Sequence, residues 1–105
     1  MRALLGKELD QALADCNAAV KLQPTDAQYL DSRGLAHLRR GEFAKAIADY
    51  DAALAANPKI DWSLFGRGVA RLRLGQTAEG NADIAAATAI NRRIVEEANE
   101  HGIEP

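Results

Sequence analysis

A repeat with a period of 34 residues limits the possible fold of this chain more than any other feature of its sequence. The residues that recur at that spacing are Pro24 and Pro58, Gly34 and Gly68, Gly41 and Gly75, and the aspartates Asp15, Asp49 and Asp83. A fixed period of this length is typical of a repeat array, in which each unit buries its apolar face against its neighbours. We therefore expect a stack of similar units rather than one round core.

Composition and apolar spacing favour helices throughout the chain. Alanine, the best helix former, stands at 22 of the 105 positions, and the few Gly and Pro residues lie between apolar runs. Apolar residues three and four positions apart predict helices at about 8–22, 27–40, 43–56 and 62–74, a fifth that starts at Thr77, and a last one through about Asn99. The residues suited to cap these helices are Thr25 or Asp26, Asp61 and Asn91. The expected fold class is all-α.

The block at residues 27–60 resembles a known repeat. The positions that carry the likeness are Leu30, Gly34, Ala46, Tyr50 and Pro58, and in these it resembles the tetratricopeptide repeat. The resemblance implies a right-handed superhelix of helical hairpins that ends in a capping helix. It divides a single domain at 1–105 into a partial first repeat at 1–26, a full repeat at 27–60, a degenerate repeat at 61–94, and a capping helix and tail at 95–105.

The resemblance also implies a function, because members of this family are adaptors whose concave groove holds a peptide or helix of a partner protein. We therefore expect a protein-binding module. One subgroup clamps the C-terminal carboxylate of chaperones with Lys, Asn and Arg side chains. The corresponding positions here are Asp31, Ser32, Trp62 and Gly66, which supply neither a cation nor an amide, so we do not expect a receptor for chaperone tails.

Two arginines replace a leucine of the family pattern and predict a pair of ion pairs. Arg33 and Arg67 recur at the repeat period, and each is followed 16 residues later by a periodic aspartate, Asp49 or Asp83. We expect each arginine to bridge to its aspartate across the two helices of one repeat, which would explain why a charge is tolerated there.

The groove is expected on the first helices of the two repeats. Trp62, Phe65 and Val69 form a second apolar stripe on the helix at about 62–74, beside the stripe that packs within its own repeat. The expected groove residues are Gln28, Asp31, Leu35, Leu38, Arg39, Trp62, Phe65, Val69 and Arg73. The alternative is that the last residues of the chain, 101–105, or a symmetry mate cover Trp62 and Phe65.

The N-terminal helix lacks the partner helix that would complete its repeat. Leu9, Leu13 and Cys16 should therefore be less covered than their equivalents one period later. We expect that this chain is a fragment of a longer array or that two copies cover each other there as a homodimer. Self-association is thus the alternative to partner binding.

Other functions find little support in the sequence. The net charge of −2 and the acidic residues among the arginines argue against nucleic-acid binding. No apolar run is long enough for a membrane span, and no targeting segment is visible, which favours a cytoplasmic location. We expect His37 and the single cysteine, Cys16, to be structural. No catalytic motif, metal site or cofactor site is recognisable, so an enzyme is not expected.

Overall fold

Helices account for all the regular structure that the computed structural model describes, which is residues 2–103, with side-chain surroundings from Asp10 onward. In chain order they are α1 (Arg2–Leu22), α2 (Ala27–Arg39), α3 (Phe43–Ala56), α4 (Asp61–Arg73), α5 (Thr77–Ile90) and α6 (Ile94–Glu100). The fold is an all-α solenoid of helical hairpins, as the sequence predicts. Among the described residues, no helix is both long and apolar enough to cross a lipid bilayer.

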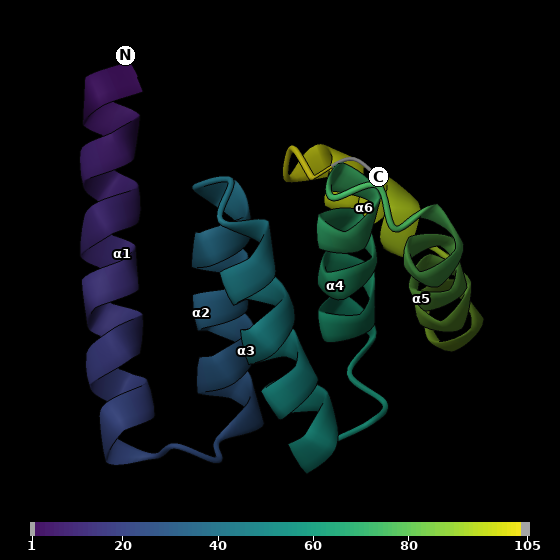
Figure 1. The fold of residues 1–105 in the computed structure, drawn as a ribbon, viewed down its shortest axis with the longest axis horizontal. Coiled ribbons are helices and arrows are strands. Elements are labelled where there is room, and N and C mark those ends of the chain that lie inside the picture. The colour runs from purple at the N-terminus through teal and green to yellow at the C-terminus, as the bar shows by residue number, and fades with distance from the viewer. Residues whose placement is uncertain (1, 104–105) are drawn as a thin grey trace.

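The helices pair in sequence order, as Figure 1 shows. α2 packs against α3, α4 packs against α5, and α1 lies beside α2 at one end of the array. α2 and α4, the first helices of the two complete hairpins, also touch each other, and the short α6 contacts both α4 and α5. This arrangement places the inner surface of the array on α2 and α4.

The turns follow from the residues at the helix ends. Gly41 and Gly75 lie after α2 and α4 with φ angles of +78° and +82°, a backbone conformation that side chains other than glycine rarely adopt. Asp26 caps α2, because its carboxylate accepts a hydrogen bond from the backbone N–H of Tyr29 at 3.1 Å. Each turn therefore sends the chain back along the helix that it has just left.

Three expected features of the helix ends are wrong in detail. α1 is one helix from Arg2, because Gly6 alone does not interrupt the helix formers around it. Asp61 is the first residue of α4, whose N-cap is Ile60. Asn91 ends α5 instead of capping α6, and its side-chain oxygen accepts the backbone N–H of Arg93 at 3.1 Å.

Close helix approach depends on the periodic glycines, as expected. A Cβ on Gly34 would lie 2.9 Å from the ring of Tyr50, and a Cβ on Gly68 would lie 2.8 Å from the backbone oxygen of Gly80. Both distances are shorter than two such atoms tolerate. The larger core cluster begins at Leu38 in α2 and continues through every later helix to Ile103.

Candidate functional site

A hollow of about 430 Å³ lies where α2, α4 and the C-terminal end of the chain meet. Its lining residues come from α2, α3, α4, α6 and the residues after α6, and they are Asp31, Leu35, Leu38, Arg39, Tyr50, Trp62, Phe65, Gly66, Glu97, His101 and Ile103. Six of the nine groove residues expected from the sequence are among them: Asp31, Leu35, Leu38, Arg39, Trp62 and Phe65. We call this hollow the groove.

Buried rings form the floor of the groove. Phe65 is 0% exposed and Tyr50 is 2% exposed, and Gly66 lies directly above the Tyr50 ring. A Cβ on Gly66 would stand 2.4 Å from that ring, so only glycine lets α4 pass so close. Burial raises the pKa of the Tyr50 hydroxyl, which keeps the floor uncharged.

The edge of the groove carries charge. Asp31 is half-buried, and its carboxylate accepts a hydrogen bond from the Ser63 hydroxyl at 2.6 Å. Burial raises the pKa of Asp31, an effect that the Ser63 hydrogen bond opposes and that nearby Asp61 reinforces. Arg39 lies on the same edge with an exposed side chain. The edge therefore offers an acidic group, Asp31, and a basic group, Arg39, beside an apolar floor.

The remaining three expected residues lie outside this hollow. Val69 and Arg73 line a neighbouring hollow of about 320 Å³, which shares Leu38, Arg39 and Ile103 with the groove. Gln28 is exposed in the first turn of α2 and lines neither hollow. The apolar stripe expected to be open on α4 is in large part core, because Phe65 and Val69 are buried and only Trp62 is half-exposed.

Part of the groove is covered by the chain itself, which is the alternative considered from the sequence. The imidazole of His101 meets the indole of Trp62 edge to face, with ring centroids 6.3 Å apart. Ile103 is 9% exposed and lines both hollows. Glu104 and Pro105, which the same alternative included, lie outside the described residues. The sequence did not single out Tyr50 or Glu97 as groove residues, because they lie on helices other than α2 and α4. Gly66 was considered only as the position of a clamp residue in the chaperone-tail subgroup.

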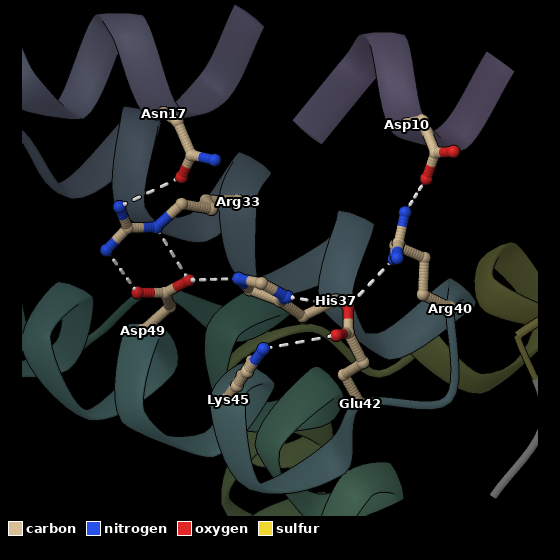
Figure 2. A network of polar contacts seen from close by, with 8 residues as sticks. All are labelled: Asp10, Asn17, Arg33, His37, Arg40, Glu42, Lys45 and Asp49. Carbon is tan, nitrogen blue, oxygen red and sulfur yellow. Dashed lines mark hydrogen bonds and ion pairs between the residues drawn. The ribbon is translucent and has the colours of Figure 1, made fainter. Parts of the chain in front are cut away.

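Both predicted ion pairs are confirmed. The Arg33 guanidinium donates to the two carboxylate oxygens of Asp49 at 2.9 and 2.7 Å, as Figure 2 shows. Arg67 binds Asp83 in the same way at 2.9 and 2.8 Å. Bidentate pairs of this kind are the strongest side-chain hydrogen bonds, and each joins the first helix of a hairpin to its second. We call Arg33 with Asp49 the first lock and Arg67 with Asp83 the second lock, and we include in each the side chains that bond to the pair.

Each lock also reaches the preceding repeat, which the sequence did not predict. Arg33 donates to the side-chain oxygen of Asn17 in α1 at 3.3 Å, and Arg67 donates to Asp51 in α3 at 2.7 Å. Both of these partners stand 16 residues before their arginine. The arginine in each first helix therefore connects the second helix of its own repeat to that of the preceding one.

His37 lies between two carboxylates in the first lock (Figure 2). One ring nitrogen, Nδ1, is 3.1 Å from Glu42, and the other, Nε2, is 3.6 Å from Asp49. The hydrogen bond with His37, helped by Lys45 and Arg40, lowers the pKa of Glu42 to about 2. His37 is thus packed and bonded within the hairpin, which fits the structural role expected for it. Within the described residues, no three His, Cys, Asp or Glu side chains gather in a way that could hold a metal ion.

α1 is more open than α3 at the positions by which α3 packs against its hairpin partner, α2. Ala12 and Asp15 are exposed, whereas their equivalents in α3, Ala46 and Asp49, are 0% and 5% exposed. Cys16 is half-buried, and this burial is the main cause that raises the pKa of its thiol. The equivalent of Cys16, Tyr50, is 2% exposed, so the expected difference in coverage is confirmed at this position.

The same expectation stays a prediction for Leu13 and Leu9. Leu13 and its equivalent, Ile47, are both half-buried. The surroundings of Leu9 lie outside the described side chains.

The comparisons with known proteins agree with this architecture. The family model described as tetratricopeptide repeat matches residues 27–60. Among solved structures, an Arabidopsis OM64 TPR domain superposes with a TM-score of 0.80 at 28% sequence identity, over 88% of this chain and 76% of that one. No curated protein matches the chain.

Proposed function

Because this chain is a tetratricopeptide repeat protein, with a repeat at residues 27–60 and the fold of a solved domain of that kind, we propose that its groove holds a peptide or helix of a partner protein. Tetratricopeptide repeat domains are protein–protein interaction modules and are generally not enzymes. The proposal concerns the place of binding and the residues that make it.

One observation carries the proposal: the first helices of two consecutive repeats, α2 and α4, together form an apolar hollow with charged groups at its edge. An apolar centre with a polar rim is the usual composition of a protein-binding surface. Trp62 is the large aromatic side chain that remains partly open, and Asp31 and Arg39 can orient a bound segment through its charges. The groove therefore offers both an anchor and a means of selection.

A selection of random peptides displayed on phage, made against the purified 105-residue chain, tests this proposal. Backbone amide shifts measured by NMR during titration with a selected peptide should change around Asp31, Leu35, Arg39 and Trp62. Trp62→Ala should weaken binding by about 2 kcal/mol or more, since partly open aromatic anchors dominate such interfaces. Helical content should stay intact, because Trp62 is only half-buried.

Two further variants make the test specific. Leu74→Ala removes an apolar side chain that is 46% exposed just after α4 and lines neither hollow, so the affinity should not change. Phe65→Ala removes a fully buried ring and should destabilise the fold together with binding. Selected peptides that shift only residues outside the groove, or bind Trp62→Ala as well as the parent chain, would refute the proposal.

Self-association through α1 is a second candidate, favoured by the exposure of Ala12 and Asp15 where the complete hairpin buries their equivalents. A helix from a second copy would then cover this face. Sedimentation equilibrium should show a dimer that Ala12→Arg dissociates. A monomer at the highest soluble concentration would remove this candidate and leave the groove proposal untouched.

A further inference from the structure

The described end of the chain, His101 to Ile103, makes the kind of contacts that a bound segment would make. The His101 ring stands edge to face against Trp62, at an interplanar angle of 76°. Two residues later, Ile103 lines both hollows, and it is 91% covered. A ring against the tryptophan and a buried aliphatic side chain in the apolar lining are what the groove's chemistry favours. We call these three residues the tail.

Backbone geometry sets the direction of the tail. The N–H of Gly102 donates to the carbonyl of Asn99 at 3.0 Å, and the N–H of Ile103 donates to that of Ala98 at 2.9 Å. These two bonds with a glycine at φ +76° form the turn that ends many helices and that points the next apolar residue back at the helix. The position of Ile103 therefore depends on the turn at Gly102 as well as on its own side chain.

The tail contacts the apolar lining of the groove and leaves the charged groups at its edge unused. Asp31 bonds to Ser63, and no hydrogen bond or ion pair joins Asp31 or Arg39 to residues 101–103. His101 itself is exposed, although its ring touches Trp62. A longer segment that reproduced the ring and the aliphatic side chain could add contacts to both charged groups at the edge. Such a segment would make more contacts with the groove than the tail makes and should therefore bind it more tightly.

We propose that the tail is an internal ligand of the groove, and that a partner displaces it with a segment that carries an aromatic or imidazole ring two residues before an aliphatic side chain. The proposal rests on the groove function proposed above and adds both the kind of segment that binds and a competition that limits its access. A partner binds only those molecules whose tail has left the groove. If the tail occupies the groove nine-tenths of the time, the apparent Kd of the partner is about tenfold higher than its intrinsic Kd.

A synthetic peptide with the sequence of residues 98–105 is the probe, and the fluorescence of Trp62, the one tryptophan of the chain, is the readout. It is titrated into the full chain and into two full-length variants. Ile103→Asp removes the aliphatic contact, and Gly102→Val strains the turn while it keeps Ile103. We expect both variants to bind the probe about tenfold or more tightly than the parent chain does. A probe that itself carries Ile103→Asp should bind none of them.

A third variant keeps the test valid if the first two fold poorly. His101→Ala removes an exposed side chain and should leave helical content unchanged while it strengthens probe binding by a factor of about three, since it frees one of two contacts. Loss of helical content in His101→Ala would show that the tail is core and overturn the proposal. Equal binding by all chains, or none by any, would do the same.

The display-selected peptides separate this proposal from the groove function. If they bind the groove of the parent chain and of His101→Ala with equal affinity, the groove function stands and the internal ligand is refuted. If they bind away from the groove, the groove function itself fails. Support for both requires that the selected peptides bind more tightly when the tail is altered and that they share the ring and aliphatic spacing.

Discussion

The two complete hairpins hold their helices together with the same arginine–aspartate pair, but they balance its charge in different ways. In the α4–α5 hairpin, Asp83 accepts from Arg67 and also from Arg71, whose terminal nitrogen is 2.9 Å away. Asp51 of the preceding repeat pairs with Arg67 at 2.7 Å. Two full positive charges thus face two full negative charges. The inner nitrogen of Arg71, Nε, is buried without a hydrogen-bond partner.

In the α2–α3 hairpin, a histidine and an amide stand where the other hairpin has Arg71 and Asp51. Asp49 accepts from Arg33, and the second side chain that approaches it is His37, at 3.6 Å. The neighbour from the preceding repeat is Asn17, an amide at 3.3 Å. The comparison shows that the bidentate arginine–aspartate pair is the constant part of the lock. Its two hydrogen bonds satisfy the guanidinium and the carboxylate of a nearly buried ion pair. The groups around that pair differ between the two repeats.

Removal of the aspartate should break the second lock more severely than the first. Asp83→Ala leaves Arg67 and Arg71 facing each other around an empty site, and we expect a loss of about 4 kcal/mol in the free energy of unfolding. Asp49→Ala leaves one arginine and a histidine, and we expect about 2 to 3 kcal/mol. Urea unfolding followed by circular dichroism measures both losses.

An exposed ion pair provides the control for this pair of variants. Arg93 and Glu96 lie 3.5 Å apart with both side chains more than 70% exposed, and Arg93→Ala should cost no more than about 0.5 kcal/mol. Equal losses for Asp83→Ala and Asp49→Ala would show that the second arginine adds nothing, and the comparison would reduce to two identical forks.

The periodic glycines should show the next largest difference between the hairpins. A Cβ at position 68 meets the backbone oxygen of Gly80, which cannot move without a shift of α5, so Gly68→Ala should cost about 2 to 3 kcal/mol. At position 34 it meets the edge of the Tyr50 ring, a side chain that can adjust, and Gly34→Ala should cost about 1 kcal/mol. Thermal unfolding of both variants compares them. A larger loss for Gly34→Ala would mean that the Tyr50 ring is held more rigidly than a helix backbone.

The hairpins should also differ in their response to acid. Glu42 precedes α3, and its pKa falls from 4.5 to about 2 through its hydrogen bond with His37, with help from Lys45 and Arg40. A carboxyl whose pKa is lower in the folded state stabilises the fold above its unfolded pKa, and that contribution disappears as the pH falls from about 4.5 to about 2. The equivalent position before α5 is Gln76, which does not titrate.

Glu42→Gln is therefore the matched variant for acid stability. It should lower the urea midpoint at pH 6 and reduce the further loss between pH 5 and pH 2 that the parent chain shows. The Glu42 side chain is 28% exposed and that of its partner Lys45 is 67% exposed, so the effect should be small and should weaken at high salt. An unchanged acid profile in Glu42→Gln would assign the acid sensitivity to other carboxylates.

The repeat period explains which parts of this architecture could be predicted. It predicts the helices and the two arginine–aspartate pairs, because Arg33, Arg67 and their aspartates recur at one spacing and a short glycine turn places the two helices of a hairpin side by side. The partners from the preceding repeat, Asn17 and Asp51, were missed, because they depend on the angle between successive repeats, which spacing does not determine. The cover over the groove could be named only as an alternative, since the periodic equivalents of Gly102, Gly34 and Gly68, lie inside helices and do not indicate the turn that directs Ile103.

The smallest expected difference is also the most specific, because it converts one lock into the other. Asn17→Asp would give Arg33 the acidic neighbour that Arg67 has, and Asp51→Asn would give Arg67 the amide that Arg33 has. Asp51 is about half exposed, so each change should shift the free energy of unfolding by only about 0.5 kcal/mol, upward for the first and downward for the second. Urea unfolding at low and high salt measures both, and the shifts should shrink at high salt because the charges are close to solvent. Shifts of the same sign, or shifts that salt does not change, would mean that packing rather than charge sets the contact between successive repeats.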